Sequence, residues 1–164
     1  MLILWLTVLA FVAGVSTPPP PPAVKADLVV VSKEARTLTL YKGNTVLKSY
    51  RIALGRSPKG HKEREGDSRT PEGRYVIDSR NAASKFHRSL HISYPNEEDR
   101  RRARARGVKP GGDIMIHGLP NGMAAIGKAH RLRDWTDGCI AVTNEEIEEI
   151  WRLVPNGTRI EIKP

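Results

Sequence analysis

Cys139 is the residue whose type and setting could do covalent chemistry. It follows Asp137 and Gly138 and precedes the apolar Ile140. A thiol on a tight glycine turn is accessible to a carbonyl carbon, and its thiolate is a nucleophile. The backbone N–H groups of Gly138 and Cys139 could point at the oxyanion that develops during the attack. A free thiol with a pKa of about 8.5 is mostly protonated near neutrality, so this cysteine needs a base.

Histidine is the obvious candidate for that base. His117 ends the apolar run 114–116 and precedes Gly118, so a strand end would hold its ring rigidly beside a cleft. Spacing alone leaves a purely structural histidine open as the alternative. His61 lies in a charged loop and is expected to face solvent. His130 lies among lysines and arginines, so we expect it to be exposed with a lowered pKa.

His87 and His91 are four residues apart, which on a helix would place both imidazoles on one face. The residues between them lack the glutamate of a zinc-hydrolase motif, and residues 90–94 (LHISY) alternate like a strand. The pair therefore does not predict a metal site.

The chain has 164 residues, one cysteine and a formal net charge of +9. This length suits one ordinary domain with a small accessory segment, and a lone cysteine excludes an intramolecular disulfide. The positive charge favours anionic surroundings, such as nucleic acid, acidic headgroups or an acidic wall polymer.

The N-terminal residues predict export. Residues 1–15 carry no charged side chain, and five prolines follow at 18–22. We interpret residues 1–16 as a signal peptide or an uncleaved membrane anchor, since the stretch is short for a full bilayer span. Residues 17–26 form a proline-rich linker. The expected location is the periplasm or cell envelope, with an inner-membrane anchor if the leader is retained, and nucleic acid is not an expected partner.

The folded part, residues 27–164, is expected to be mainly β (α+β). Val, Leu, Thr and Tyr enrichment, alternation and turn residues predict strands. The expected strands are 28–32, two runs within 36–55 joined by a turn at 42–44, 74–78, 114–116 and 158–162. Residues 56–72 are charged and rich in Gly and Pro, which predicts a mobile loop.

Two short helices are expected at the edges of these strands. Asn96 can cap the first, in which acids precede a run of arginines that ends at Gly107. We interpret the arginine run as a solvated helix face, with a dedicated binding patch as the alternative. Asn144 can cap the second helix, 145–154, whose apolar residues fall on one face.

Four segments together resemble the YkuD-type L,D-transpeptidase family and its YafK-like subgroup. They are IMIHG (114–118), DWTDGCIAVTN (134–144), TPEG (70–73) and SYPN (93–96). The resemblance covers residues 27–164 and implies a β-sandwich-like catalytic domain that acts on peptidoglycan stem peptides. By this resemblance Cys139 attacks the carbonyl carbon at the L,D bond, D-alanine leaves, and the acyl-thioester passes to an amine or to water.

The same resemblance assigns roles to individual residues. His117 would deprotonate the thiol, the Gly118 carbonyl would orient the imidazole, and N–H groups of Gly138 and Cys139 would hold the oxyanion. No metal or other cofactor is implied. The side chains expected along the substrate cleft are His91, Tyr94, Trp135 and Thr136.

Two positions depart from the family pattern. Asp137 stands where a histidine is common, and Ala141 stands where an arginine is common. A missing cation beside the nucleophile bears on how substrate carboxylates are held and on the acyl acceptor. A peptidoglycan hydrolase or amidase that uses the same Cys–His site is therefore an alternative, and a non-catalytic basic module that binds the wall is a second. We expect a monomer.

Overall fold

The computed structural model describes residues 24–164. The expected leader, residues 1–16, and most of the proline-rich linker lie outside the described residues. Across residues 24–164, none of the helices has both the length and the apolar character that crossing a bilayer requires.

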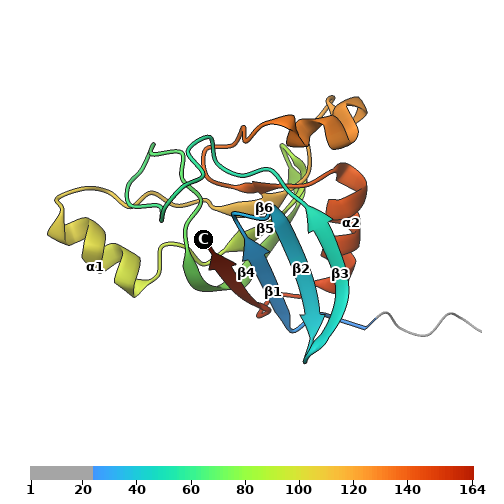
Figure 1. The fold of residues 1–164 in the computed structure, drawn as a ribbon, viewed down its shortest axis with the longest axis horizontal. Helices are drawn as coiled ribbons and strands as arrows, with labels where there is room; N and C mark the ends of the chain where they lie inside the picture. Colours follow the sequence, from blue (N-terminus) through green and yellow to red (C-terminus); the bar gives the residue numbers. More distant parts are fainter. Residues whose placement is uncertain (1–23) are drawn as a thin grey trace, which may run out of the picture.

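Eight strands form one curled sheet (Figure 1). Their order across the sheet is β3-β2-β1-β8-β4-β5-β6-β7. The strands are β1 (Leu28–Ser32), β2 (Thr37–Lys42), β3 (Thr45–Arg51), β4 (Gly73–Ser84), β5 (His87–Ile92), β6 (Met115–His117), β7 (Ile140–Ala141) and β8 (Arg159–Lys163). The turn between β2 and β3 falls at Gly43 and Asn44, as predicted. The mainly β expectation is confirmed.

The long strand β4 is the reason the sheet curls. Its first residues pair with β8 at Gly73–Val76, and its later residues, from Ile77, pair with β5. The curl brings the two ends of the sheet together: Ala53, just after β3, exchanges backbone hydrogen bonds of 3.0 and 2.9 Å with Ala141 of β7. The chain segment after β3 therefore lies against the strand that follows Cys139.

The hydrophobic core fills the inside of this curled sheet. Alternate residues of the strands point inward, so that Val29, Val31, Leu38 and Leu40 are fully buried while their neighbours are not. The alternation of apolar and polar residues in the sequence predicts these inward positions, because successive side chains of a strand point to opposite faces.

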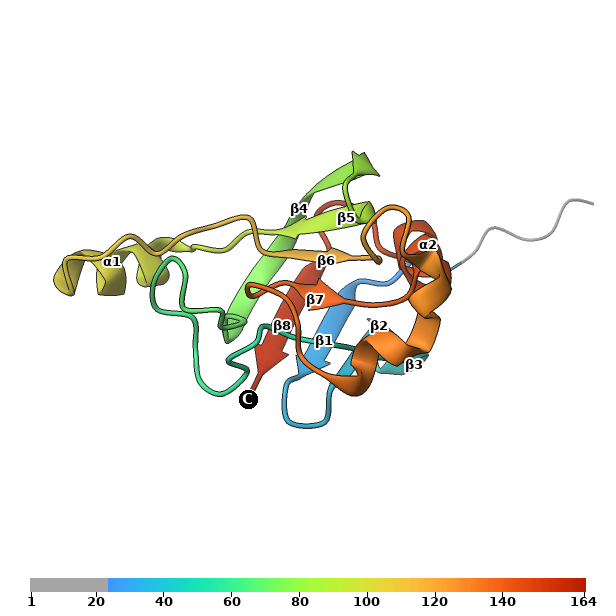
Figure 2. The same cartoon turned by 90° about the horizontal axis from the view of Figure 1, so that it is seen from above.

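The helices lie at the ends of the molecule (Figure 2). Helix α1 (Glu97–Ala105) begins at the cap Asn96, whose side chain accepts from Asp99 N at 3.0 Å, as predicted. Its arginines contact Glu97 and Glu98 of the same helix, which fits the solvated-face interpretation.

Helix α2 (Asn144–Leu153) corrects one expectation. Its cap is Thr143, whose hydroxyl accepts from Glu146 N, and not Asn144. The buried residues Ile147 and Ile150 pack on the core. A third element, the 3₁₀ segment η1 (Ala124–Leu132), was not expected. It lacks a side-chain cap and is interrupted by Gly127 at φ 48°, so no local helix signal marks it.

The segment 56–72 has no helix or strand, but it is held closely against the domain. Lys62 and Asp67 form an ion pair of 2.9 Å between buried side chains. The prediction that His61 faces solvent is wrong. Its Nε2 lies 3.0 Å from Asp99 of α1, and its Nδ1 accepts from Glu72 N at 2.9 Å. This acidic partner from a distant element holds the ring against the domain, so that only 17% of the His61 side chain is exposed.

Candidate active site

Strands β6 and β7 position the thiol and the imidazole. They pair in parallel, with Ile116 opposite Ile140 and His117 opposite Ala141. Both isoleucines are fully buried in the core. Cys139 immediately precedes β7, and side chains alternate along a strand, so extending this register by one residue places Cys139 and His117 on the other face, two residues apart along the ladder. That geometry puts their Cα atoms on the order of 8 Å apart, within reach for the two side chains to meet.

His117 is held in one tautomer. Its Nδ1 lies 2.7 Å from the Gly118 carbonyl oxygen, and since a carbonyl only accepts, Nδ1 carries the hydrogen. The Nε2 atom is then the lone-pair nitrogen of the neutral ring. The side chain is buried between Phe86 and Trp135, with ring centroids 4.4 and 5.8 Å away. Burial lowers the pKa of His117 to about 4, although the bond to Gly118 opposes that shift.

The thiol of Cys139 is half-buried and neutral. Its Sγ donates to the Asp113 carbonyl oxygen at 3.4 Å. Burial raises the pKa of Cys139 to about 11, the Met115 N–H opposes this, and the carboxylates of Asp113 and Asp137 add to it. In residues 24–164 no hydrogen bond joins the thiol to His117, so Sγ must leave the Asp113 carbonyl before the imidazole can take its proton.

The turn before the thiol is braced by Thr136. Its hydroxyl oxygen accepts from Gly138 N at 3.1 Å and donates to the Cys139 carbonyl at 2.7 Å. Gly138 has φ 133°, and a Cβ there would lie 2.6 Å from the Arg69 carbonyl oxygen, so only glycine fits. The Gly138 N–H is thus already engaged, which leaves Cys139 N–H as the free one of the two expected oxyanion donors. Thr136 is buried and braces the turn; its hydroxyl has no bond left to donate to a substrate.

Asn144 fixes the chain after the imidazole. Its Oδ1 accepts from Leu119 N at 2.8 Å and sits 2.7 Å from where a Cβ on Gly118 would be. The Gly118 N–H donates to the Phe86 carbonyl at 3.1 Å. Gly118 is therefore enclosed on two sides. The roles of Phe86 and Asn144 at the site were not predicted from the sequence. Asn144 could have been found, because it ends the segment that carries Cys139.

The YkuD model, which describes the L,D-transpeptidase catalytic domain, matches residues 26–162. The chain belongs to this family. Its similarity to YafK of Escherichia coli K12, described as a candidate L,D-transpeptidase, is 33% identity over 132 residues, 77% of this chain and 46% of YafK.

Solved structures share the fold of this family member. Pgp2 of Campylobacter jejuni, a helical cell shape determining protein, superposes with a TM-score of 0.65 at 24% identity, covering 86% of this chain and 49% of Pgp2. An L,D-transpeptidase from Xylanimonas cellulosilytica superposes with a TM-score of 0.53 at 17% identity, covering 89% of this chain and 64% of that one. The chain spans about half the length of YafK and of Pgp2.

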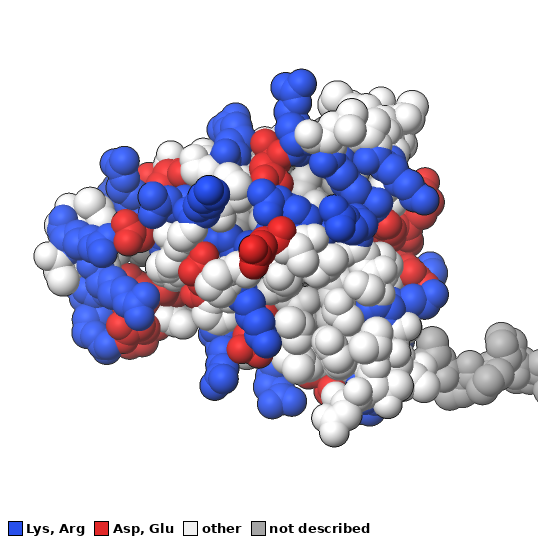
Figure 3. Space-filling view, in the orientation of Figure 1, with Lys and Arg blue, Asp and Glu red and all other residues white. Residues whose placement is uncertain are grey.

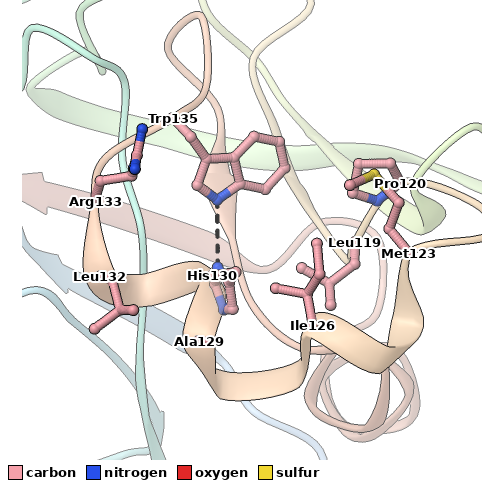
Figure 4. Close-up of a pocket in the computed structure, with 9 residues that line it drawn as sticks. All are labelled: Leu119, Pro120, Met123, Ile126, Ala129, His130, Leu132, Arg133 and Trp135. Carbon is pink, nitrogen blue, oxygen red and sulfur yellow. Dashed lines mark hydrogen bonds between the residues drawn. The ribbon is translucent and has the colours of Figure 1, made fainter.

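Trp135 joins the site of this L,D-transpeptidase-family chain to an apolar cavity of about 320 Å³ (Figure 4). Its indole N–H donates to His130 Nδ1 at 3.4 Å, while its ring stands edge-on to His117. The prediction that His130 is exposed is wrong: the side chain, which belongs to η1, is buried and packs edge-on against Trp135. The predicted lowering of its pKa is confirmed, with burial as the larger cause and Arg131 as the smaller.

The other two expected cleft residues lie differently. His91 is opposite Met115 on β5, so it shares the face of Cys139 two strands away, and its Nδ1 contacts Asp78 at 2.6 Å. Tyr94 is buried, and its hydroxyl donates to the Pro110 carbonyl at 2.9 Å, away from solvent. Within residues 24–164, His, Cys, Asp and Glu side chains do not gather into a group of three or more that could hold a metal.

The two departures from the family pattern have structural settings. The exposed Asp137 forms an ion pair with Arg56, which enters from the segment after β3. Ala141 is fully buried, and its backbone pairs with Ala53. Arg56 is thus one cation at the cysteine turn, and a second, the buried Lys62, acts on the thiol itself by opposing the rise in the pKa of Cys139.

Proposed function

We propose that the protein is a cysteine-dependent L,D-transpeptidase that acts on peptidoglycan stem peptides. The observation that supports this proposal is the pairing of β6 with β7, which puts His117 opposite Ala141, two residues after Cys139, with the imidazole tautomer fixed by Gly118. Membership of the L,D-transpeptidase catalytic-domain family supports the reaction class.

The reaction would proceed by acyl transfer through a thioester. The Cys139 proton moves to His117 Nε2 as Sγ attacks the carbonyl carbon at the L,D bond of the stem peptide. The oxyanion accepts from the Cys139 N–H. Collapse breaks the C–N bond, and the leaving D-alanine amine takes the proton from His117. An acceptor amine then attacks the thioester, His117 removes its proton, and the thiol is regenerated.

The electrostatics of the free site favour general-base catalysis over a resting ion pair. Burial disfavours both the thiolate and the imidazolium: it raises the pKa of Cys139 and lowers the pKa of His117. The two groups therefore rest as thiol and imidazole, and charge develops only when the substrate is attacked. The buried ring is ready to act as a base throughout the physiological pH range.

The proposed setting is the cell envelope. An apolar leader with a proline-rich spacer suits an exported domain, either periplasmic or held at the inner membrane, and a charge of +9 suits an anionic wall. A monomer acting without a metal or cofactor belongs to the same proposal.

A product assay on defined muropeptides tests the proposal. Full-length protein and its Cys139→Ala variant are incubated with tetrapeptide monomers, and the products are separated and weighed. New crosslinked dimers from the wild type, absent with Cys139→Ala, are the expected result. Shortened monomers alone would assign the hydrolase or amidase activity instead. Full activity in Cys139→Ala would overturn the cysteine mechanism.

Covalent trapping gives a second readout that does not need the correct acceptor. Imipenem should add one acyl group to the reduced wild-type chain, visible in its intact mass, and none to Cys139→Ala. If the wild type binds wall polymer but neither turns over nor forms an adduct, the basic wall-binding module is the better description.

A further inference from the structure

Segment η1 carries an exposed aliphatic surface. Met123, Ile126 and Leu132 are 46%, 39% and 88% exposed, and all three border the cavity beside Trp135 (Figure 4). We call these three residues the η1 patch. They are half of the large hydrophobic residues exposed in residues 24–164; the other three are Val24, Val46 and Val76, which belong to separate elements. Aliphatic side chains gathered outside a core mark an interaction surface.

Cations flank the η1 patch. Lys128 belongs to η1, and Arg133 follows its last residue and borders the same cavity. Within the described chain neither Lys128 nor Arg133 has a carboxylate within ion-pairing distance. Figure 3 shows uncharged atoms protruding where η1 lies, with Lys and Arg side chains gathered directly below them.

The nearby acids do not cancel this charge. Asp134 is paired with Arg36 at 2.8 Å, and Glu146 is paired with Arg131. These two carboxylates are therefore compensated by their own arginines, whereas Lys128 and Arg133 have no such partner in residues 24–164. This combination of aliphatic and cationic side chains is typical of a surface that lies in the headgroup region of an anionic bilayer. A protein-binding hot spot would be enriched in exposed aromatic residues, which the patch lacks.

The patch also lies within about one helix length of the start of the described chain. Ala26 N donates to the Leu153 carbonyl at 2.8 Å, so the described chain enters at the end of α2, while Arg131 pairs with Glu146 at the start of α2. Helix α2, with 10 residues, is about 15 Å long. One bilayer could therefore meet both the segment that precedes Val24 and the patch.

We propose that the η1 patch is a membrane-docking surface, which inserts its aliphatic side chains among the headgroups of an anionic bilayer while Lys128 and Arg133 contact the phosphates. A leader of 15 uncharged residues is short for a full span, so a second contact would strengthen its attachment to the membrane. The docking surface goes beyond the proposed reaction and does not depend on it.

A local probe tests docking in the full-length chain, whose leader is expected to bind vesicles by itself. In a Cys139→Ser background, Ala125→Cys is labelled with an environment-sensitive fluorophore, because Ala125 is exposed between Met123 and Ile126. Val46→Cys on β3, 54% exposed in the free domain, is the matched control. Both chains are bound to vesicles of phosphatidylcholine alone or mixed with phosphatidylglycerol.

The expected result is a blue shift and protection from iodide quenching at position 125 on the anionic vesicles, and neither change at position 46. Adding Lys128→Gln and Arg133→Gln should weaken the affinity of the patch for anionic vesicles about 30-fold. Each cation near such a surface contributes about 1 kcal/mol of binding free energy, and about 1.4 kcal/mol corresponds to a factor of ten in affinity.

Equal exposure to iodide at positions 125 and 46, on vesicles that hold the full chain, would overturn the proposal. So would a blue shift at position 125 that grows with protein concentration without vesicles, since that result would assign the patch to contact between copies of the chain.

Discussion

Replacing Thr136 with valine removes the hydroxyl that braces the cysteine turn while nearly preserving the side-chain shape. In the structure this one oxygen accepts from Gly138 N at 3.1 Å and donates to the Cys139 carbonyl at 2.7 Å. Both bonds lie behind the thiol, and Thr136 and Gly138 are buried. The substitution therefore leaves an N–H and a carbonyl without their partner, with little water to replace it.

The magnitude follows from these two groups. A buried donor or acceptor that loses its partner costs about 1–3 kcal/mol, so Thr136→Val should lower the free energy of unfolding by about 3 kcal/mol, allowing for partial relaxation. The released Gly138 N–H also frees the turn that aims Sγ. We expect acylation by imipenem to slow by about tenfold or more, because a small misplacement of a reacting atom is costly in rate.

The assay pairs urea unfolding with the rate of imipenem adduct formation by intact mass. Thr158→Val is the matched control, since its buried hydroxyl donates to the Pro155 carbonyl at 2.7 Å in the turn before β8. That variant should lose stability but keep its acylation rate under folding conditions. If Thr136→Val acylates as fast as Thr158→Val does, the turn is not what positions the thiol, and the reasoning fails.

Three further predictions concern the site and its supports. The acid limb of the acylation rate should fall near pH 4 and not near the ordinary imidazole pKa of about 6.5, because His117 stays unprotonated down to its lowered pKa; a pH–rate profile with a limb at the ordinary value would contradict this. Gly118→Ala places a Cβ 2.7 Å from a side-chain oxygen and should both destabilise the fold and slow acylation, whereas Gly112→Ala, with no atom within 4 Å, should do neither in the same two assays. Lys62→Met leaves the carboxylate of Asp67 buried without its partner and should cost about 3–5 kcal/mol in thermal or urea unfolding, a loss that the double replacement with Asp67→Leu should partly restore.

Much of the fold was predictable because its signals are local. The alternation in residues 28–32 and 37–42 reports a period of two, and the core of the curled sheet consists of those inward positions. The cap of α1 was equally predictable, since Asn96 and Asp99 bond to each other's backbone across three residues. Segment η1 was missed because it has neither a cap nor an uninterrupted helical backbone.

Contacts made in the folded chain account for the errors. His61 is held by the distant Asp99, and His130 is buried within η1 against Trp135, so the charged sequence neighbours misled both predictions. Asn144 has a residue type that caps helices, yet its side chain turns to Leu119 and leaves the cap to Thr143. Local composition cannot show which of two competing hydrogen-bond partners folding brings closer.

The sequence by itself determined the family and predicted the nucleophile and the base that we propose, because Gly138–Cys139 and His117–Gly118 are short motifs whose residues are neighbours in the chain. Only the tertiary structure decided how the two meet. The parallel pairing of β6 with β7 places both side chains on one face, and burial there makes both groups neutral. The structure also decided that the Gly138 N–H donates to the nearby Thr136 hydroxyl, that Arg56 pairs with Asp137, and that aliphatic side chains of η1 stay outside the core. The pairing of β6 with β7 and the pairing of Arg56 with Asp137 join segments far apart in the chain, and such contacts exist only after the sheet has curled and its two ends have come together.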